Sequence, residues 1–150
     1  MLRERALASP YVKDYDSIGG SRPRDWGQYF DLSNWALHSA WIDDRRVGGV
    51  VTAFRTEGLD MLERRADLAV IWDIRVTPDH RGRGVGSALF AAAEAWAKAK
   101  GCRQLKIETQ NVNVAACRFY LHRACTLGGI HRFAYPLLPD ELQLLWYKDI

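Results

Sequence analysis

Cysteine residues and long apolar runs are both scarce in this chain, and each scarcity argues against a class of protein. The 150 residues include three cysteines, Cys102, Cys117 and Cys125, without a CxxC pair, which is typical of free thiols in a reducing compartment. No apolar run approaches the roughly 20 residues of a membrane-spanning helix. The first residues also lack the apolar stretch of a secretory signal. We therefore expect a cytoplasmic protein with no membrane partner.

Metal-ligand spacing and massed positive charge are missing as well. The histidines show no ligand pattern, so we predict no metal site. A net charge of +3 is mild and the basic residues are scattered, which argues against a nucleic-acid partner. With a hydrophobic fraction of 48%, the chain suits one compact domain over residues 1–150.

The hydrophobic pattern predicts strands and helices over most of the chain. Apolar residues at spacings of three and four indicate helices, and short β-branched or aromatic runs between turn residues indicate strands. In chain order we predict strands at 35–42, 47–54 and 68–76, a helix at 85–100, a strand at 104–109, a helix at 113–124, and strands at 127–135 and 141–147. This order indicates an α/β fold with a mixed sheet flanked by helices. Residues 43–46 are expected to form a charged turn, and residues 17–23, rich in Gly, Ser and Pro, a loop.

The strongest chemical signal is a glycine-rich segment between a buried strand and an amphipathic helix. Residues 80–87 read HRGRGVGS. Glycines let the backbone approach a ligand closely and turn several N–H groups in one direction. The helix N-terminus adds free donors and partial positive charge. With the guanidinium groups of Arg81 and Arg83, the segment suits a pyrophosphate.

Two other phosphate-binding motifs fit this segment poorly. A P-loop requires Lys followed by Ser or Thr after the glycines, and neither pair is present. A dinucleotide-binding GxGxxG motif matches at Gly82 and Gly84, but Ser87 stands at the third glycine. The strand order also opens with hairpins instead of a βαβ unit. Taken alone, the segment could also be a tight turn whose arginines are solvated.

The glycine segment and its neighbours resemble the GNAT superfamily of N-acetyltransferases. Residues 81–86, RGRGVG, are similar to the R/Q-x-x-G-x-G/A motif of that superfamily. The strand before them ends in IRVTP at 74–78, and NVAACRFY at 113–120 resembles the family's N-x-x-A-x-x-x-Y helix. The likeness covers about residues 35–147.

A narrower likeness points to one branch of the superfamily. The segments WDIRV at 72–76, ETQN at 108–111, ACRFY at 116–120 and LWYK at 145–148 are similar to streptothricin acetyltransferases, which acetylate an amine of that antibiotic. Two departures stand out. Ala124-Cys125 replaces the usual Gly-Phe, and the N-terminal third is short, which leaves the acceptor side of the pocket undefined.

The resemblance implies an N-acetyltransferase whose acetyl donor is acetyl-CoA. In the superfamily the central strand splays from its neighbour, and its free main-chain groups meet the pantetheine arm and thioester. Tyr120 would protonate the leaving thiolate, and Asn113 would bond the pantetheine arm or cap its helix. The implied cofactor-binding residues are Ile74, Val76, Arg81, Gly82, Arg83, Gly84, Val85, Gly86, Ser87 and Asn113.

Two acidic residues in apolar strands are candidates for proton transfer. An alkylamine has a free pKa of about 10.4 and must lose a proton before it attacks a thioester. Asp73 and Glu108 each interrupt a predicted strand next to the expected splay, where a carboxylate could hold a cationic amine and take its proton. The alternative is an internal ion pair, for example with Arg75 or Lys106.

The acceptor pocket has less support in the sequence. The aromatic residues Trp26, Tyr29, Phe30 and Trp35 could form its wall and offer cation–π contact, or they could be core residues under a long loop. We expect a small cationic amine, an antibiotic such as streptothricin. Alternatives are an aminoglycoside, a polyamine or a protein or peptide amine, and a non-catalytic acetyl-CoA-binding module is a further one. The oligomeric state is left open, with a homodimer as one option.

Overall fold

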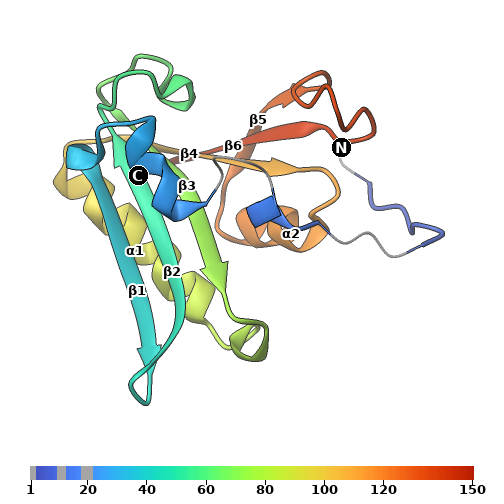
Figure 1. Ribbon diagram of the computed structural model, residues 1–150, viewed down its shortest axis with the longest axis horizontal. Coiled ribbons are helices and arrows are strands. Elements are labelled where there is room, and N and C mark those ends of the chain that lie inside the picture. The colour runs from blue at the N-terminus through green and yellow to red at the C-terminus, as the bar shows by residue number, and fades with distance from the viewer. Residues whose placement is uncertain (1–2, 10–12, 18–21) are drawn as a thin grey trace.

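The fold is built on one six-stranded sheet, which the computed structural model describes for residues 3–9, 13–17 and 22–150 (Figure 1). The strands lie in the order β1-β2-β3-β4-β6-β5. Their bounds are β1 Trp35–Ile42, β2 Arg45–Phe54, β3 Leu68–Val76, β4 Gln104–Gln110, β5 Thr126–His131 and β6 Gln143–Asp149. Neighbours are antiparallel except β3 and β4, which are parallel. The predicted mixed, mostly antiparallel sheet is confirmed.

Two helices connect the strands around the parallel pair. α1 (Val85–Ala99) connects β3 to β4, and α2 (Val114–His122) follows β4. α1 buries residues spaced three and four apart, as an amphipathic helix should: Leu89, Phe90, Ala93 and Ala97. Phe90 of α1 also contacts the rings of Phe119 and Tyr120 on α2, with centroids 5.9 and 6.4 Å away. The helices therefore meet beside the ends of β3 and β4.

Several element ends differ from the prediction. The charged turn shrinks to Asp43 and Asp44, both with positive φ, so β2 begins two residues earlier than expected. β5 ends at His131, since only 126–131 pair with β6, and the predicted extension to 135 is wrong. β6 continues to Asp149 because Gln104 pairs with it.

The N-terminal loop prediction is only partly open to comparison. Residues 18–21 lie outside the described residues, and Pro23–Gln28 forms a short 3-10 helix with proline at its start. Proline suits this position because its missing N–H would have no partner in the first turn.

α1 ends within one residue of its prediction, and α2 ends at His122, two residues before the predicted end. Gly101, at φ +80°, follows α1 as a C-terminal glycine should. Ala124 adopts φ +59° at the position where the superfamily usually has glycine. A left-handed conformation costs an alanine about 1–2 kcal/mol, so the unusual residue leaves the turn in place.

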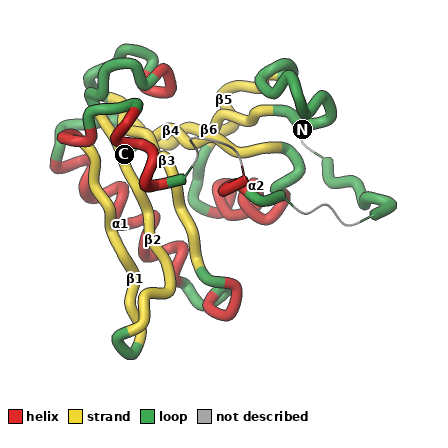
Figure 2. Tube along the Cα trace, in the orientation of Figure 1, coloured by secondary structure: helices red, strands yellow, loops and turns green. Residues whose placement is uncertain are grey.

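β3 and β4 separate part-way along their length (Figure 2). They are paired from Leu68 opposite Gln104 to Ile71 opposite Ile107, and no further. The rest of β3 stays paired with β2 as far as Val76. The predicted splay of the central strand is therefore present. None of the described helices is long and apolar enough to cross a membrane.

Candidate active site

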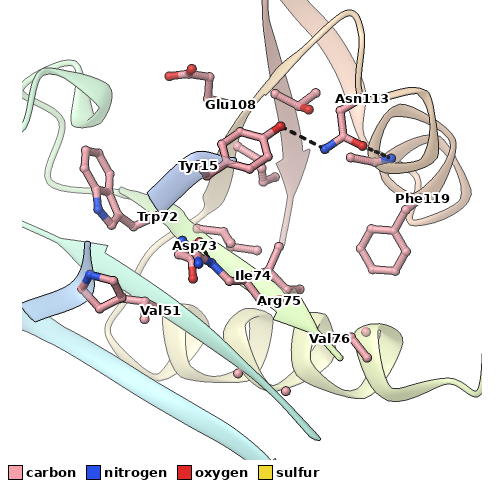
Figure 3. A pocket seen from close by; sticks show the side chains of 18 of the residues that line it. Tyr15, Val51, Trp72, Asp73, Ile74, Arg75, Val76, Glu108, Asn113 and Phe119 are labelled. Carbon is pink, nitrogen blue, oxygen red and sulfur yellow. Dashed lines mark hydrogen bonds and ion pairs between the residues drawn. The ribbon is translucent and has the colours of Figure 1, made fainter. Parts of the chain in front are cut away.

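A large cleft lies in the gap where β3 and β4 separate. It has a volume of about 2220 Å³, and residues from β3, the glycine segment, β4, α2 and the N-terminal segment line it. Figure 3 shows side chains of this wall, with Asp73 on β3, Glu108 on β4 and Asn113 at the start of α2. The predicted catalytic residues Tyr120, Asp73 and Glu108 all border this cleft.

The main-chain groups of Ile74 and Val76 point into the gap. The N–H of Thr77 donates to the Val47 carbonyl of β2 at 2.9 Å. Because the hydrogen-bonding direction alternates along a strand, the groups of residues 74 and 76 face the opposite edge, where β4 has moved away. The Val76 carbonyl there accepts from Nε of Arg81 at 3.1 Å. The splay thus turns main-chain donors and acceptors of β3 toward the cleft, where a ligand could bind them.

The glycine segment turns into α1 with two residues in the left-handed region. Gly82 has φ +72°, and Gly84, the N-cap of α1, has φ +84°. A Cβ at either position would meet nothing within 4 Å, so the space beside both is open. The members that line the cleft are Arg81, Gly82, Gly84, Gly86 and Ser87. Arg83 and Val85 are not among them, and Val85 packs on the core instead.

Tyr120 is buried on α2 and lines the cleft. Its ring packs against Phe90, Phe119 and Trp146, at centroid distances of 5.5–6.4 Å. Burial raises the pKa of its hydroxyl well above the usual range, so the group stays protonated at neutral pH. Core packing and a proton-donor role are both compatible with this position.

Asn113 caps α2, as one of the two predicted interpretations requires. Its side-chain oxygen accepts from the N–H of Ala116 at 3.2 Å. Its Nδ2 donates to the hydroxyl of Tyr15 at 3.3 Å. The cap fixes the amide at the mouth of the cleft, where the predicted pantetheine contact would also need it.

Asp73 is held in an ion pair with Arg75, the alternative that the sequence left open. Nε of Arg75 donates to Oδ1 of Asp73 at 2.9 Å. Burial raises the pKa of Asp73, and the hydrogen bond and charge of Arg75 offset part of that rise. Asp73 therefore faces the cleft with its negative charge partly balanced.

Glu108 has neutral hydrogen-bond partners instead of a cation. Its Oε1 accepts from the hydroxyl of Tyr135 and from Nε2 of Gln110. Lys106, the predicted alternative partner, pairs with Glu63 at 2.7 Å. Burial and the neighbouring carboxylate raise the pKa of Tyr135 above its usual range, so its hydroxyl remains a donor.

The N-terminal aromatic residues form one cluster with Trp72 of β3. The ring centroids of Trp26, Phe30, Trp35 and Trp72 lie 5.7–6.4 Å apart in the contacting pairs. Trp26 is buried and the others are partly buried, yet all line the cleft. Tyr29 also lines the cleft but is 63% exposed. Trp26, Phe30 and Trp35 therefore have both predicted roles, because they pack in the core and also form part of the cleft wall.

Sequence reasoning missed several polar residues of the cleft region, among them Tyr15, Asp16, Gln110 and Tyr135. Tyr15 and Gln110 line the cleft and share a hydrogen bond of 2.8 Å, and Tyr135 reaches Glu108 from the turn after β5. Gln110 lay within ETQN, one of the segments that resemble streptothricin acetyltransferases, but Tyr15 carried no pattern that could single it out.

The histidines do not gather anywhere in the site. Among residues 3–9, 13–17 and 22–150, no group of three or more His, Cys, Asp or Glu side chains could hold a metal ion. His80 lies beside the glycine segment, where its Nδ1 contacts the Thr77 hydroxyl at 3.0 Å.

Comparison with known proteins decides the family. The family described as "Acetyltransferase (GNAT) family" matches residues 4–125. The chain belongs to the GNAT acetyltransferases. This confirms the predicted resemblance, the fold, the N-acetyltransferase class and the use of acetyl-CoA as acetyl donor.

Individual relatives cover nearly the whole chain. Streptothricin acetyltransferase A of Bacillus subtilis (strain 168) is 38% identical over 96% of this chain and 76% of its own length. Streptothricin acetyltransferase of Escherichia coli is 34% identical over 93% of this chain and 71% of its own length. A solved Bacillus anthracis structure, in complex with acetyl coenzyme A, is 29% identical over 93% of this chain and 73% of its own, with a TM-score of 0.73.

Proposed function

We propose that this GNAT enzyme acetylates an amine of a streptothricin-class antibiotic. The observation that carries the proposal is the shared cleft, which carboxylates from both splayed strands, Asp73 and Glu108, line together with the glycine segment. A cationic amine would be attracted to those carboxylates. The names and coverage of the Bacillus subtilis and Escherichia coli relatives support this choice of acceptor.

The donor side is assigned to the glycine segment and the gap. The open N-terminus of α1, Gly82, Gly84 and the Arg81 guanidinium fit a pyrophosphate, which would displace the contact of Arg81 with Val76. Free main-chain groups of Ile74 and Val76 fit the amide-bearing pantetheine arm. Bound acetyl-CoA supplies an electrophilic thioester carbonyl next to these groups.

The chain's own residues divide the proton transfers between them. Asp73 holds the incoming ammonium, and Glu108 takes its proton directly or through a water molecule. The free amine then attacks the thioester carbonyl, and the carbon–sulfur bond breaks as the amide bond forms. Tyr120, which burial keeps protonated, donates its proton to the departing thiolate. The nitrogen loses its second proton to water, and a proton from water replaces the one that Tyr120 has given up.

Neutralising the two carboxylates separately is expected to give different kinetic defects. Asp73→Asn should raise KM for the acceptor about tenfold, since it removes one charge from the anchor. Glu108→Gln should lower kcat by about 100-fold, the low end of general-base catalysis. Steady-state kinetics with purified variants measures both values, and acetyl-CoA affinity serves as control. Normal kinetics in both variants would contradict the assignment of these carboxylates.

The reaction is expected to speed up as pH rises. The solvent must finally accept the proton of the amine, whose pKa is about 10.4, so kcat/KM should rise between about pH 6 and 9. Burial raises the pKa of Asp73, and its protonation should add a further decline on the acid side. That added decline should vanish in Asp73→Asn. A flat pH–rate profile would contradict rate control by amine deprotonation.

The proposal extends to the domain organisation and cellular compartment of the enzyme. We place residues 1–150 as one catalytic domain in the cytoplasm, with a homodimer as an open option. The free thiols support a reducing compartment, since Cys102 and Cys125 are buried and Cys117 is partly so. Burial raises the pKa of Cys125 to about 11, which keeps this thiol unreactive.

A thiol-release assay with a panel of amines tests the acceptor class. Streptothricin, an aminoglycoside, a polyamine and a peptide amine are each offered with acetyl-CoA. We expect the highest kcat/KM for streptothricin. If only the peptide amine were acetylated, the acceptor would be a protein or peptide amine and not an antibiotic. Acetyl-CoA binding without turnover of any amine would support a non-catalytic binding module.

A further inference from the structure

A short N-terminal segment bridges the two splayed strands. The 3-10 turn Tyr15–Ser17 lies across the cleft, and Figure 3 shows the hydrogen bond between Asn113 and the hydroxyl of Tyr15. On one side Nη1 of Arg75 on β3 donates to both carboxylate oxygens of Asp16 at 2.9 Å. On the other side the Tyr15 hydroxyl donates to Oε1 of Gln110 on β4 at 2.8 Å.

Arg75 is shared between two carboxylates. Its Nε binds Asp73 at 2.9 Å, while its Nη1 binds Asp16. One guanidinium therefore faces two carboxylates, and the triad keeps one negative charge. Without Asp16, the charge of Arg75 would cancel that of Asp73. Arg46 also lines the cleft, and its positive charge acts to lower the pKa of Asp73. Without Asp16, Asp73 would therefore face the guanidinium groups of both Arg46 and Arg75.

We propose that Asp16 is a specificity-determining residue of the acceptor site, because it offsets Arg75 and leaves Asp73 available to a cationic amine. The inference rests on the proposed function and extends it to a residue of the N-terminal segment. The side chains of Asp16 and Arg75 are 47% and 44% exposed, and that of Asp73 is 24% exposed. An incoming ammonium would therefore meet the triad at the wall of the cleft, before any deeper group.

If Asp16 acts through its charge, its replacement has an expected effect that a purely structural role of this residue would not produce. Asp16→Asn should lower kcat/KM for a cationic acceptor about three- to tenfold, mostly through KM, as expected for one partly screened charge. The double variant Asp16→Asn/Arg75→Gln also lacks the bridge to β3 but regains one net negative charge. It should return kcat/KM to within about twofold of the unmutated enzyme.

The control and a salt series complete the test. Asp44→Asn removes a like charge from the β1–β2 turn, outside the cleft, at a positive φ that asparagine tolerates, and should leave kcat/KM unchanged. KM of the unmutated enzyme should rise with ionic strength, and that of Asp16→Asn should rise less.

The outcomes separate this inference from the function on which it rests. Normal kinetics in Asp16→Asn would overturn it. A double variant as slow as the single one would also overturn it, because the bridge and not its charge would then matter. If the unmutated enzyme acetylates no cationic amine, the proposed function itself fails.

Discussion

Replacing Tyr120 with phenylalanine is expected to lower kcat by roughly 10²–10⁴, the usual contribution of general acid–base catalysis. The change removes one hydroxyl and keeps the ring that packs against Phe90, Phe119 and Trp146. The fold should therefore persist. Burial holds the pKa of Tyr120 above its usual range, so at neutral pH the hydroxyl carries the proton that the departing thiolate needs. Stopped-flow or steady-state thiol release measures the change.

A second tyrosine supplies the matched control for this variant. The Tyr147 hydroxyl binds Glu63, outside the cleft, and Tyr147→Phe removes the same atom from the same residue type. Its kcat should stay within about twofold of the unmutated value, since surface changes seldom reach the site. If Tyr120→Phe behaves in the same way, Tyr120 is a packing residue and the thiolate takes its proton from water.

Gly84→Glu is expected to abolish the stabilisation that acetyl-CoA gives to the protein. At 100 times Kd a ligand adds about 2.7 kcal/mol to the free energy of unfolding, or about 5–10 °C in Tm for a chain of this size. Gly84 caps α1, and a carboxylate there would repel the pyrophosphate from the open space beside it. Differential scanning calorimetry with and without acetyl-CoA measures the shift.

A second glycine provides a control for the backbone strain that Gly84→Glu introduces. Gly84 has φ +84°, so any side chain costs about 1–2 kcal/mol there. Gly58 has φ +76°, has nothing within 4 Å of a built Cβ, and lies outside the cleft. Gly58→Glu should lower Tm by a similar amount yet keep the full acetyl-CoA shift. A full shift in Gly84→Glu would place the pyrophosphate elsewhere.

The backbone of the site could be predicted because its signals are local. The run of apolar residues over Leu68–Val76 predicted the central strand to the residue. The glycines at 82 and 84 marked the turn into α1, because both adopt a positive φ that other residues disfavour. The position of Tyr120 followed from helical spacing and family likeness. The ends of β2, β5 and β6 were misplaced by two to four residues, because pairing with a distant strand sets each of them, and α2 ends at His122 instead of residue 124.

The polar contacts of the site could not be predicted, because they join residues far apart in the chain. Arg75 binds Asp16 across 59 positions, and Tyr15 binds Gln110 across 95. For Asp73 the neighbouring Arg75 could be named as a possible partner, but nothing in the sequence indicated that Asp16 would share that guanidinium. Tyr135 lies in a turn where no periodic pattern places its side chain.

Mass spectrometry of streptothricin incubated with acetyl-CoA and the purified protein tests the central claim most directly. We predict a product that carries one added acetyl group on an amine, formed together with an equal amount of free coenzyme A, and very little of it with Tyr120→Phe. Unmodified antibiotic after prolonged incubation, with protein that binds acetyl-CoA normally, would contradict the account.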